Sequence, residues 1–133
     1  MFLGSYKLSF DLNSRRVALP KKIRDYLATS EIVLSIGFEK CLFGFDTKAW
    51  IKEATKQTDL PIFDKSARNI RRLFFSAATI VKLDDQGRFV IPGALLQYAK
   101  NVKPIIIGAG DHFEIWDEKA WEKEFVEIEK GQQ

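Results

Sequence analysis

The segment DTKAW at residues 46–50 recurs as DEKAW at residues 117–121, so the same pattern returns 71 positions later. Further identities keep the same order along the chain. They pair Gly37 with Gly108, Tyr26 with Tyr98, Pro20 with Pro92, Arg15 with Arg88, and Asp11 with Asp84. The offset grows from 71 to 73 toward the N-terminus, which indicates extra residues in turns or loops of the first copy. Colinear matches of this kind predict two copies of one structural unit.

Each copy begins with a segment whose apolar and polar residues alternate, which is typical of a half-buried strand. These segments cover residues 6–10 and residues 79–83. A turn follows each of them, at residues 12–14 and residues 85–87, and a glycine closes the second turn. In the second copy residues 89–91 form the return strand, so each unit is predicted to start with a β-hairpin.

The second part of each copy predicts a helix, two strands and another helix. Pro20 and Pro92 are suited to the first position of a helix, where the missing N–H of proline costs nothing. Apolar runs then predict a pair of strands in each copy, at residues 32–36 with 41–45 and at residues 105–107 with 112–116. Asp46 and Asp117 follow these strands as natural N-caps of the next helix.

The longer helices each show one apolar side. The inward residues are predicted to be Ala67, Ile70, Leu73 and Phe74 in a helix from about Asp64, and Trp121, Phe125 and Ile128 in the last helix. Apolar patterns continue on both sides of the loop at Pro61, so we predict one α+β domain over residues 1–133. Repeat 1 covers about 5–53, repeat 2 covers about 78–125, and a loop with a basic helix at about 54–77 joins them.

Composition excludes several classes of protein. Cys41 is the single cysteine and His112 the single histidine, so the chain can form neither an internal disulfide nor a multi-cysteine metal site. We therefore expect no metal, no cofactor, and a reducing compartment such as the cytoplasm. No run of about 18 uncharged apolar residues occurs and no signal-peptide pattern is present, so we expect no membrane partner.

Charge is distributed unevenly, although the net charge is only +3. Residues 1–30 have a net charge of +4, and residues 111–133 have a net charge of −5. A second basic group lies between the copies and contains Lys65, Arg68, Arg71 and Arg72. This asymmetry indicates one face for a polyanion, and the alternative is a set of ordinary solvated helix faces.

The two hairpin turns hold the main candidates for function. Each contains an aspartate and an arginine four positions apart, and the pairs are Asp11 with Arg15 and Asp84 with Arg88. An arginine at the base of a hairpin can bind a phosphate or the edge of a guanine, and the aspartate can fix its rotamer. The alternative is a structural pair that only holds the turn. Recurrence in both copies favours a binding role.

The helix predicted after the first hairpin begins with basic residues. Lys21, Lys22 and Arg24 are candidates for contacts with DNA phosphates, which position a protein on the duplex. The alternative is again a solvated helix face.

Catalytic alternatives have little support. A hydrolase would have to use His112 with Asp111, and no second histidine, nucleotide-binding loop or positioned nucleophile accompanies them. A structural histidine is the preferred interpretation. Stacking on single-stranded nucleic acid would need exposed aromatic side chains, whereas the spacing of the tryptophans favours core packing. We therefore predict no enzymatic activity and no small-molecule substrate.

Several segments together resemble one known family, the MraZ proteins, which are bacterial regulators associated with the division and cell-wall gene cluster. The segments are MFLG at the start, two DxxxR motifs, GFEKCLF at 37–43, RRLFFSA at 71–77, GRFVIP at 87–92 and FEIWD at 113–117. The resemblance covers nearly the whole chain. It implies two AbrB-like swapped-hairpin halves in one intertwined domain, assembly into homo-oligomeric rings, and binding to direct repeats in the promoter of the protein's own operon. It also implies that Asp11, Arg15, Asp84 and Arg88 contact double-stranded DNA.

One spacing differs between the copies. In the family motif the arginine stands four residues before the proline, as Arg88 does to Pro92. In the first copy Arg15 stands five residues before Pro20, and Arg16 stands four before it. Counting from the aspartate selects Arg15 and counting from the proline selects Arg16, so both are candidates for the contact with DNA.

The residues thus predict a DNA-binding transcriptional regulator of the cytoplasm and nucleoid, and the resemblance implies that it acts as a ring oligomer. The alternative is an oligomeric scaffold for proteins, which would bind DNA weakly and without regard to its sequence. Three partners stay open for the basic helix with Arg68, Arg71 and Arg72: DNA, a neighbouring subunit, or acidic groups of its own chain.

Overall fold

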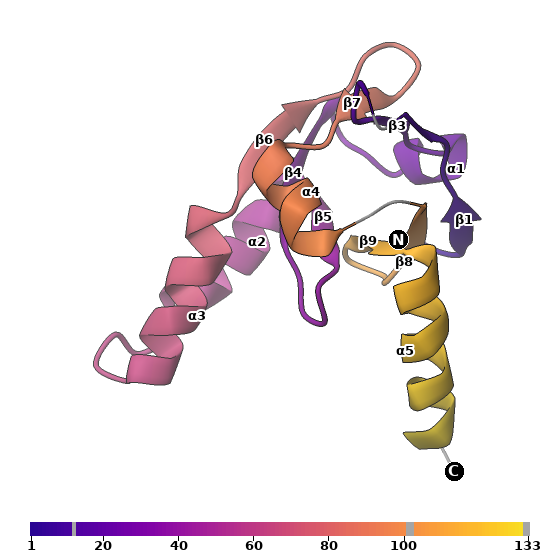
Figure 1. The fold of residues 1–133 in the computed structure, drawn as a ribbon. Coiled ribbons are helices and arrows are strands. Elements are labelled where there is room, and N and C mark those ends of the chain that lie inside the picture. The colour runs from indigo at the N-terminus through magenta and orange to yellow at the C-terminus, as the bar shows by residue number, and fades with distance from the viewer. Residues whose placement is uncertain (12, 101–102, 132–133) are drawn as a thin grey trace.

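The computed structural model describes residues 1–11, 13–100 and 103–131 of the chain. It has a mixed α+β fold, and Figure 1 shows helices α2 and α3 side by side on one side of the strands and α5 on another. Within the described residues, no helix combines the length and the apolar character that crossing a membrane requires.

Six strands form the main antiparallel sheet, in the order β1-β8-β9-β5-β4-β6. They are β1 (Ser5–Lys7), β4 (Glu31–Ile36), β5 (Leu42–Asp46), β6 (Thr79–Lys82), β8 (Pro104–Gly108) and β9 (Phe113–Asp117). The two strand pairs expected in the second part of each copy are confirmed, because β4 pairs with β5 and β8 pairs with β9. β5 also pairs with β9, so the two copies join in the middle of this sheet.

A smaller sheet consists of β2 (Phe10–Asp11), β3 (Arg16–Ala18) and β7 (Arg88–Val90), with β3 in the middle. β2 and β3 form the hairpin expected for the first copy, although Leu12 of its turn lies outside the described residues. β3 and β7 come from different copies and pair symmetrically, with Val17 opposite Phe89.

The second hairpin differs from the sequence expectation because its two strands belong to different sheets. The Asp84 N–H donates to the Arg88 carbonyl at 3.0 Å and closes the turn. Beyond this turn, β6 pairs with β4 and β7 pairs with β3. β1 makes the equivalent exchange by pairing with β8. Each copy therefore supplies an edge strand to the strand pair of the other, which is the swapped-hairpin arrangement that the resemblance implied.

Helices connect these strands, and the described ones are α1 (Lys21–Arg24), α2 (Thr47–Thr58), α3 (Lys65–Ser76), α4 (Gly93–Ala99) and α5 (Glu118–Gly131). Pro20 and Pro92 stand directly before α1 and α4, at the N-cap rather than at the first helical residue. The Asp46 carboxylate caps α2 as expected by accepting backbone N–H groups of its first turn. The Asp117 carboxylate accepts the N–H of Lys103 at 3.2 Å, which ties the start of α5 to the residue before β8.

The main hydrophobic core contains side chains from both sheets and from the short helices of both copies. Ile23 of α1 and Leu95 of α4 are buried in it. Gly44 of β5 lies opposite Phe113 of β9, and a Cβ atom at Gly44 would overlap the Phe113 ring. The glycine therefore makes room for a large core side chain from the other copy.

Two helices bury less of their apolar sides than the sequence predicted. In α3, Ala67 is buried, but Ile70 is 43% exposed and Leu73 is 57% exposed. In α5, Phe125 is 47% exposed and Ile128 is 42% exposed. Both helices extend away from the strands in Figure 1, so their outer turns have no sheet to cover. The amphipathic pattern identified the helices correctly, and the expected burial is wrong for these side chains.

The tryptophans pack against other aromatic side chains, as expected. Trp116 is buried, and the Trp121 ring packs edge-on against it with centroids 5.4 Å apart. The Trp50 ring stacks on Phe74 with centroids 4.6 Å apart, which joins α2 to α3.

Candidate nucleic-acid interface

The turn between β6 and β7 is organised by the carboxylate of Asp84. Its Oδ1 accepts the backbone N–H groups of Gln86 at 2.9 Å and Arg88 at 2.8 Å, and its Oδ2 accepts the Arg88 Nε–H at 2.7 Å. The backbone N–H of Arg88, and then its guanidinium, hold the pKa of Asp84 below its ordinary value. Among the described residues only Nε of the guanidinium has a hydrogen-bond partner, so the terminal N–H groups can bind a ligand.

The first turn is built differently because it has one more residue. Asp11 Oδ1 accepts the N–H of Asn13 at 3.0 Å, and no side-chain pair between Asp11 and Arg15 occurs in the described part of this turn. The Arg15 N–H donates instead to the Asp11 carbonyl at 2.6 Å. Arg15 has a φ of 58°, in the left-handed region that favours glycine. Arg15 thus closes the turn with its backbone.

Two backbone hydrogen bonds between the copies show which residues are equivalent. The Ile91 N–H donates to the Arg15 carbonyl at 2.9 Å, and the Leu19 N–H donates to the Gly87 carbonyl at 2.9 Å. The donors are 72 positions apart in the sequence, and so are the acceptors. Gly87 has a φ of 76°, which is also left-handed. Arg15 therefore occupies in the first turn the position that Gly87 occupies in the second.

Arg16 is consequently the structural counterpart of Arg88. Each is the first residue of its strand, and in the β3–β7 pair Arg16 lies opposite Val90 while Arg88 lies opposite Ala18. All four of these side chains are exposed, whereas the residues between them are buried, because strand side chains alternate between faces. The outer face of β3 and β7 thus presents one arginine from each copy.

A shallow groove of about 510 Å³ lies along this outer face. Arg16 and Arg88 both line it, together with Asp11, which is the direct partner of Arg16 across the β2–β3 pair. Arg15 is not among the lining residues. The structure therefore brings Asp11, Arg16 and Arg88 to one site.

The basic residues of α1 divide into two kinds. Lys21 and Lys22 are exposed to solvent. Arg24 is half-buried, its Nε–H donates to the Leu19 carbonyl at 3.1 Å, and its side chain lies against Gly87. Arg24 therefore supports the second turn. Sequence reasoning missed this contact because it joins residues of different copies.

Comparison with known proteins identifies the family. The sequence model of the protein family described as "MraZ protein, putative antitoxin-like" matches residues 1–73 and again residues 74–132. The chain belongs to the MraZ family. A Lactiplantibacillus plantarum protein named "Transcriptional regulator MraZ" is 39% identical over 124 residues, which are 92% of this chain and 86% of the relative. Relatives of the same name from Roseiflexus sp. (strain RS-1) and Roseiflexus castenholzii are 39% and 37% identical over 123 residues, which are 92% of this chain and 85% of each relative.

The two matches of the MraZ model confirm that the chain repeats one unit, as the colinear identities predicted. They also confirm the resemblance that the motifs indicated. In this MraZ protein the second match includes the swapped strand β6 and the complete second turn.

The basic helix α3 of this MraZ protein makes no ion pair with the described acidic groups of its own chain. The Arg68 guanidinium donates to the Ile62 carbonyl at 2.9 Å, and the Arg72 guanidinium donates to Asn69 at 3.3 Å. Among the three partners that the sequence left open for these arginines, DNA and a neighbouring subunit remain.

His112 has partners at both ring nitrogens, which fits the structural interpretation. Nδ1 lies 2.8 Å from Asp111 Oδ1, and Nε2 lies 3.0 Å from Glu114 Oε2. The ring also packs against Phe43 and Phe45, with centroids 4.8 Å and 5.6 Å away. Burial by itself would lower the pKa of His112, but the hydrogen bonds and charges of the two carboxylates outweigh it and raise the pKa.

This arrangement predicts a dependence of stability on pH. Because the pKa of His112 is raised on folding, its ion pairs stabilise the fold below the unfolded value of about 6.5, and this stabilisation is lost as the pH rises through the folded value. We expect the parent to show a larger fall in urea midpoint, by circular dichroism, than His112→Gln between about pH 6 and about pH 8.5. Equal changes in the two proteins would contradict this account of His112.

Proposed function

We propose that this protein is a sequence-specific DNA-binding regulator of transcription, which contacts double-stranded DNA with the outer face of β3 and β7. The observation that carries the proposal is the symmetric placement of Arg16 and Arg88 on that face. A two-stranded ribbon fits the major groove of B-DNA, where arginine can bind the O6 and N7 atoms of guanine. The name shared by the relatives, transcriptional regulator, supports the same role.

The residues of the interface have different tasks in this proposal. Arg88 reads a base edge with the terminal N–H groups that its contact with Asp84 leaves available. Arg16 does the same in the first copy, with Asp11 beside it. Phosphate contacts come from Lys21 and Lys22. Arg15 and Arg24 act on the turns themselves, the first through its backbone and the second through its contact with Gly87.

We also propose that copies of the chain assemble head-to-tail through α3 and α5. Both helices carry exposed apolar side chains, and their charges are complementary: α3 contains four basic residues and no acidic one, while residues 111–133 have a net charge of −5. Two different surfaces that fit each other produce a heterologous contact, which closes into a ring when the rotation permits. The basic helix thus meets a neighbouring subunit.

A ring of this kind would present several β3–β7 faces to short direct repeats in the promoter of the protein's own operon, in the division and cell-wall gene cluster. That site of action places the protein in the cytoplasm at the nucleoid. We further infer that residues 1–133 fold as one domain, because the edge strand of each repeat pairs in the other repeat's half of the main sheet.

The ring proposal predicts a dependence of affinity on the number of DNA repeats. The second contact of an assembled ring is intramolecular, so affinity should rise about 100-fold from one repeat to three at constant spacing. Fluorescence anisotropy with labelled duplexes of equal length measures this. Equal affinities would exclude multivalent binding. The exposed apolar helices also suit the alternative, a protein scaffold, and that alternative predicts weak binding to any duplex.

A further inference from the structure

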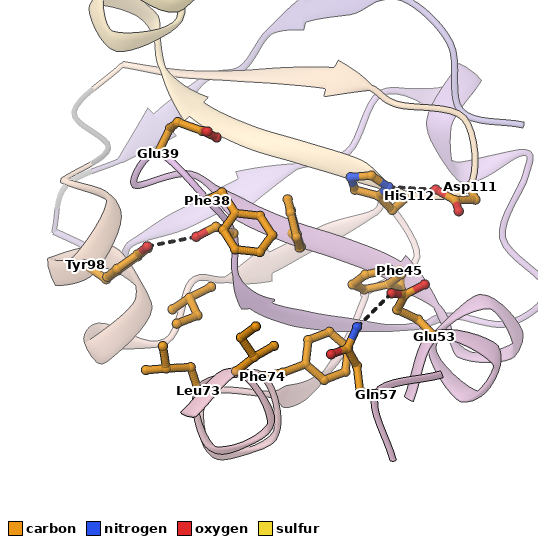
Figure 2. A pocket seen from close by; sticks show the side chains of 14 residues that line it. Phe38, Glu39, Phe45, Glu53, Gln57, Leu73, Phe74, Tyr98, Asp111 and His112 are labelled. Carbon is orange, nitrogen blue, oxygen red and sulfur yellow. Dashed lines mark hydrogen bonds and ion pairs between the residues drawn. The ribbon is translucent and has the colours of Figure 1, made fainter. Parts of the chain in front are cut away.

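A cavity of about 410 Å³ lies between the α2–α3 pair, the turn that joins β4 to β5, and α4. Figure 2 shows Phe38, Phe45, Phe74 and Leu73 around it, on three different segments of the chain. Its volume is within the range of about 300–1,000 Å³ that is usual for small-molecule sites with apolar walls. None of its lining residues belongs to the sheet that contains β3 and β7, so the cavity is separate from the proposed DNA interface.

The polar groups of the cavity are those that accept hydrogen bonds. The Tyr98 hydroxyl donates to the Gly37 carbonyl at 2.8 Å, and the Gln57 amide N–H donates to Glu53 at 3.2 Å (Figure 2). Both nitrogens of His112 are taken by its two carboxylate neighbours. The Tyr98 hydroxyl and the His112 nitrogens are thus used within the protein, and the Gln57 amide uses one of its two N–H groups, while each oxygen keeps capacity to accept. Acceptors therefore predominate, which favours a ligand that donates hydrogen bonds.

One acceptor in the cavity wall has no partner among the described residues. Gln57 Oε1 is buried, and none of the described groups donates to it. A buried polar atom without a partner is uncommon in native proteins, because the lost contact with water is then not replaced. The amide lines the cavity next to Glu53, so a donor bound there can satisfy the amide after a small rotation of the side chain.

The charges of the lining residues also favour a ligand that donates hydrogen bonds, in particular a cation. Three carboxylates line the cavity, those of Glu39, Glu53 and Asp111, against the single imidazole of His112. Lys56, which is 3.7 Å from Glu53, is exposed and is not a lining residue. An ammonium group has three donors and a positive charge, and the faces of aromatic rings attract cations.

We propose that this cavity binds a small apolar molecule with one protonated amino group, placed with its apolar body against Phe45 and Phe74 and its ammonium toward Glu53 and Gln57. This site is independent of the proposed DNA interface. An arylalkylamine of about ten non-hydrogen atoms fits the volume.

The test uses three probes of one shape with the full-length protein at neutral pH: 2-phenylethylamine, the neutral 2-phenylethanol and the anionic 3-phenylpropanoate. Isothermal titration calorimetry should give saturable binding of the amine, about tenfold weaker binding of the alcohol, and no binding of the acid up to about 10 mM. Equal affinities for the three probes, or no saturable binding of the amine, overturn the proposal. Absence of saturable amine binding is also the result expected if another copy of the chain fills the cavity, so that occupant would replace the amine.

Substitutions of lining residues test whether the amine binds in this cavity. Glu53→Gln keeps the shape and removes the charge, so we expect about tenfold weaker binding of the amine. Leu73→Trp fills the cavity from a side chain that is 57% exposed, so it should abolish binding without disturbing the core. Because α3 is also part of the proposed subunit contact, size-exclusion chromatography checks that the variant keeps the oligomeric state of the parent. The matched control is Glu31→Gln on β4, an exposed residue that does not line the cavity, which should bind as the parent does. Circular dichroism checks that each variant is folded, and Ile70→Trp replaces Leu73→Trp if the latter is not. Binding that survives the filling variant places the amine elsewhere and contradicts the proposal.

Discussion

Arg88→Ala and Arg16→Ala should each lower the affinity for the protein's own promoter by about 10- to 100-fold, whereas Arg15→Gly should leave it near the parent value. A bidentate contact between arginine and guanine contributes about 1–3 kcal/mol of discrimination, which sets the size of the loss. The two losses should be similar because Arg16 and Arg88 are equivalent across the β3–β7 pair. Fluorescence anisotropy with a labelled promoter duplex measures all three variants.

Arg15→Gly is a matched control for the two alanine variants, because it removes a neighbouring arginine from the same turn. Arg15 has a φ of 58°, and glycine adopts that conformation without the cost of roughly 1 kcal/mol that other residues have. The variant should therefore be at least as stable as the parent. If Arg15→Gly loses binding while Arg16→Ala keeps it, the equivalence of Arg16 with Arg88 does not extend to DNA contact.

Gly44→Ala should destabilise the fold by about 3 kcal/mol, a large part of the stability of a small domain. A Cβ atom at this position would overlap the ring of Phe113, which is fully buried and held in place by β9. The strands cannot separate easily, because Gly44 and Phe113 are direct partners in the register of β5 and β9. Urea unfolding followed by circular dichroism measures the change.

Two further variants show whether the loss of stability comes from the contact between Gly44 and Phe113. Gly131→Ala is the same chemical change at a position where nothing lies within 4 Å, so it should leave the free energy of unfolding unchanged. Adding Phe113→Leu to Gly44→Ala should cost less than the sum of the two single changes, because the smaller side chain makes room for the new methyl group. A Gly44→Ala protein as stable as the parent would contradict this account of the contact between the copies.

The repeat allowed much of the fold to be predicted from the sequence. Matching identities placed the strand pairs β4–β5 and β8–β9 and the prolines before α1 and α4 in both copies. Alternation of residues could not show which strand β6 and β7 would pair with, because a hairpin and its swapped form have the same local pattern. The exchange followed from the family resemblance, and the register confirms it.

The helices show where amphipathic patterns are insufficient. The apolar sides of α3 and α5 were identified correctly, but the pattern does not say whether the partner lies in the same chain. Ile70 and Phe125 are therefore exposed where the sequence predicted burial.

The site residues stay a prediction, and the structure adds their geometry. Spacing alone left Arg15 and Arg16 as alternatives for the contact with DNA, and the left-handed backbone of Arg15 places it at the position of Gly87, while Arg16 stands at that of Arg88. The support that Arg24 gives to Gly87 was not visible in the sequence, because 63 positions separate the two residues and only the fold brings them together.

The most direct test of the central claim compares binding of the purified parent to the DNA upstream of its own gene and to a scrambled duplex of the same length, each at two salt concentrations. The account predicts specific binding that is at least about 1,000-fold tighter than binding to the scrambled duplex, with an affinity that falls as salt rises because phosphate contacts release counterions. Equally weak binding to both duplexes would contradict it and would favour the scaffold role.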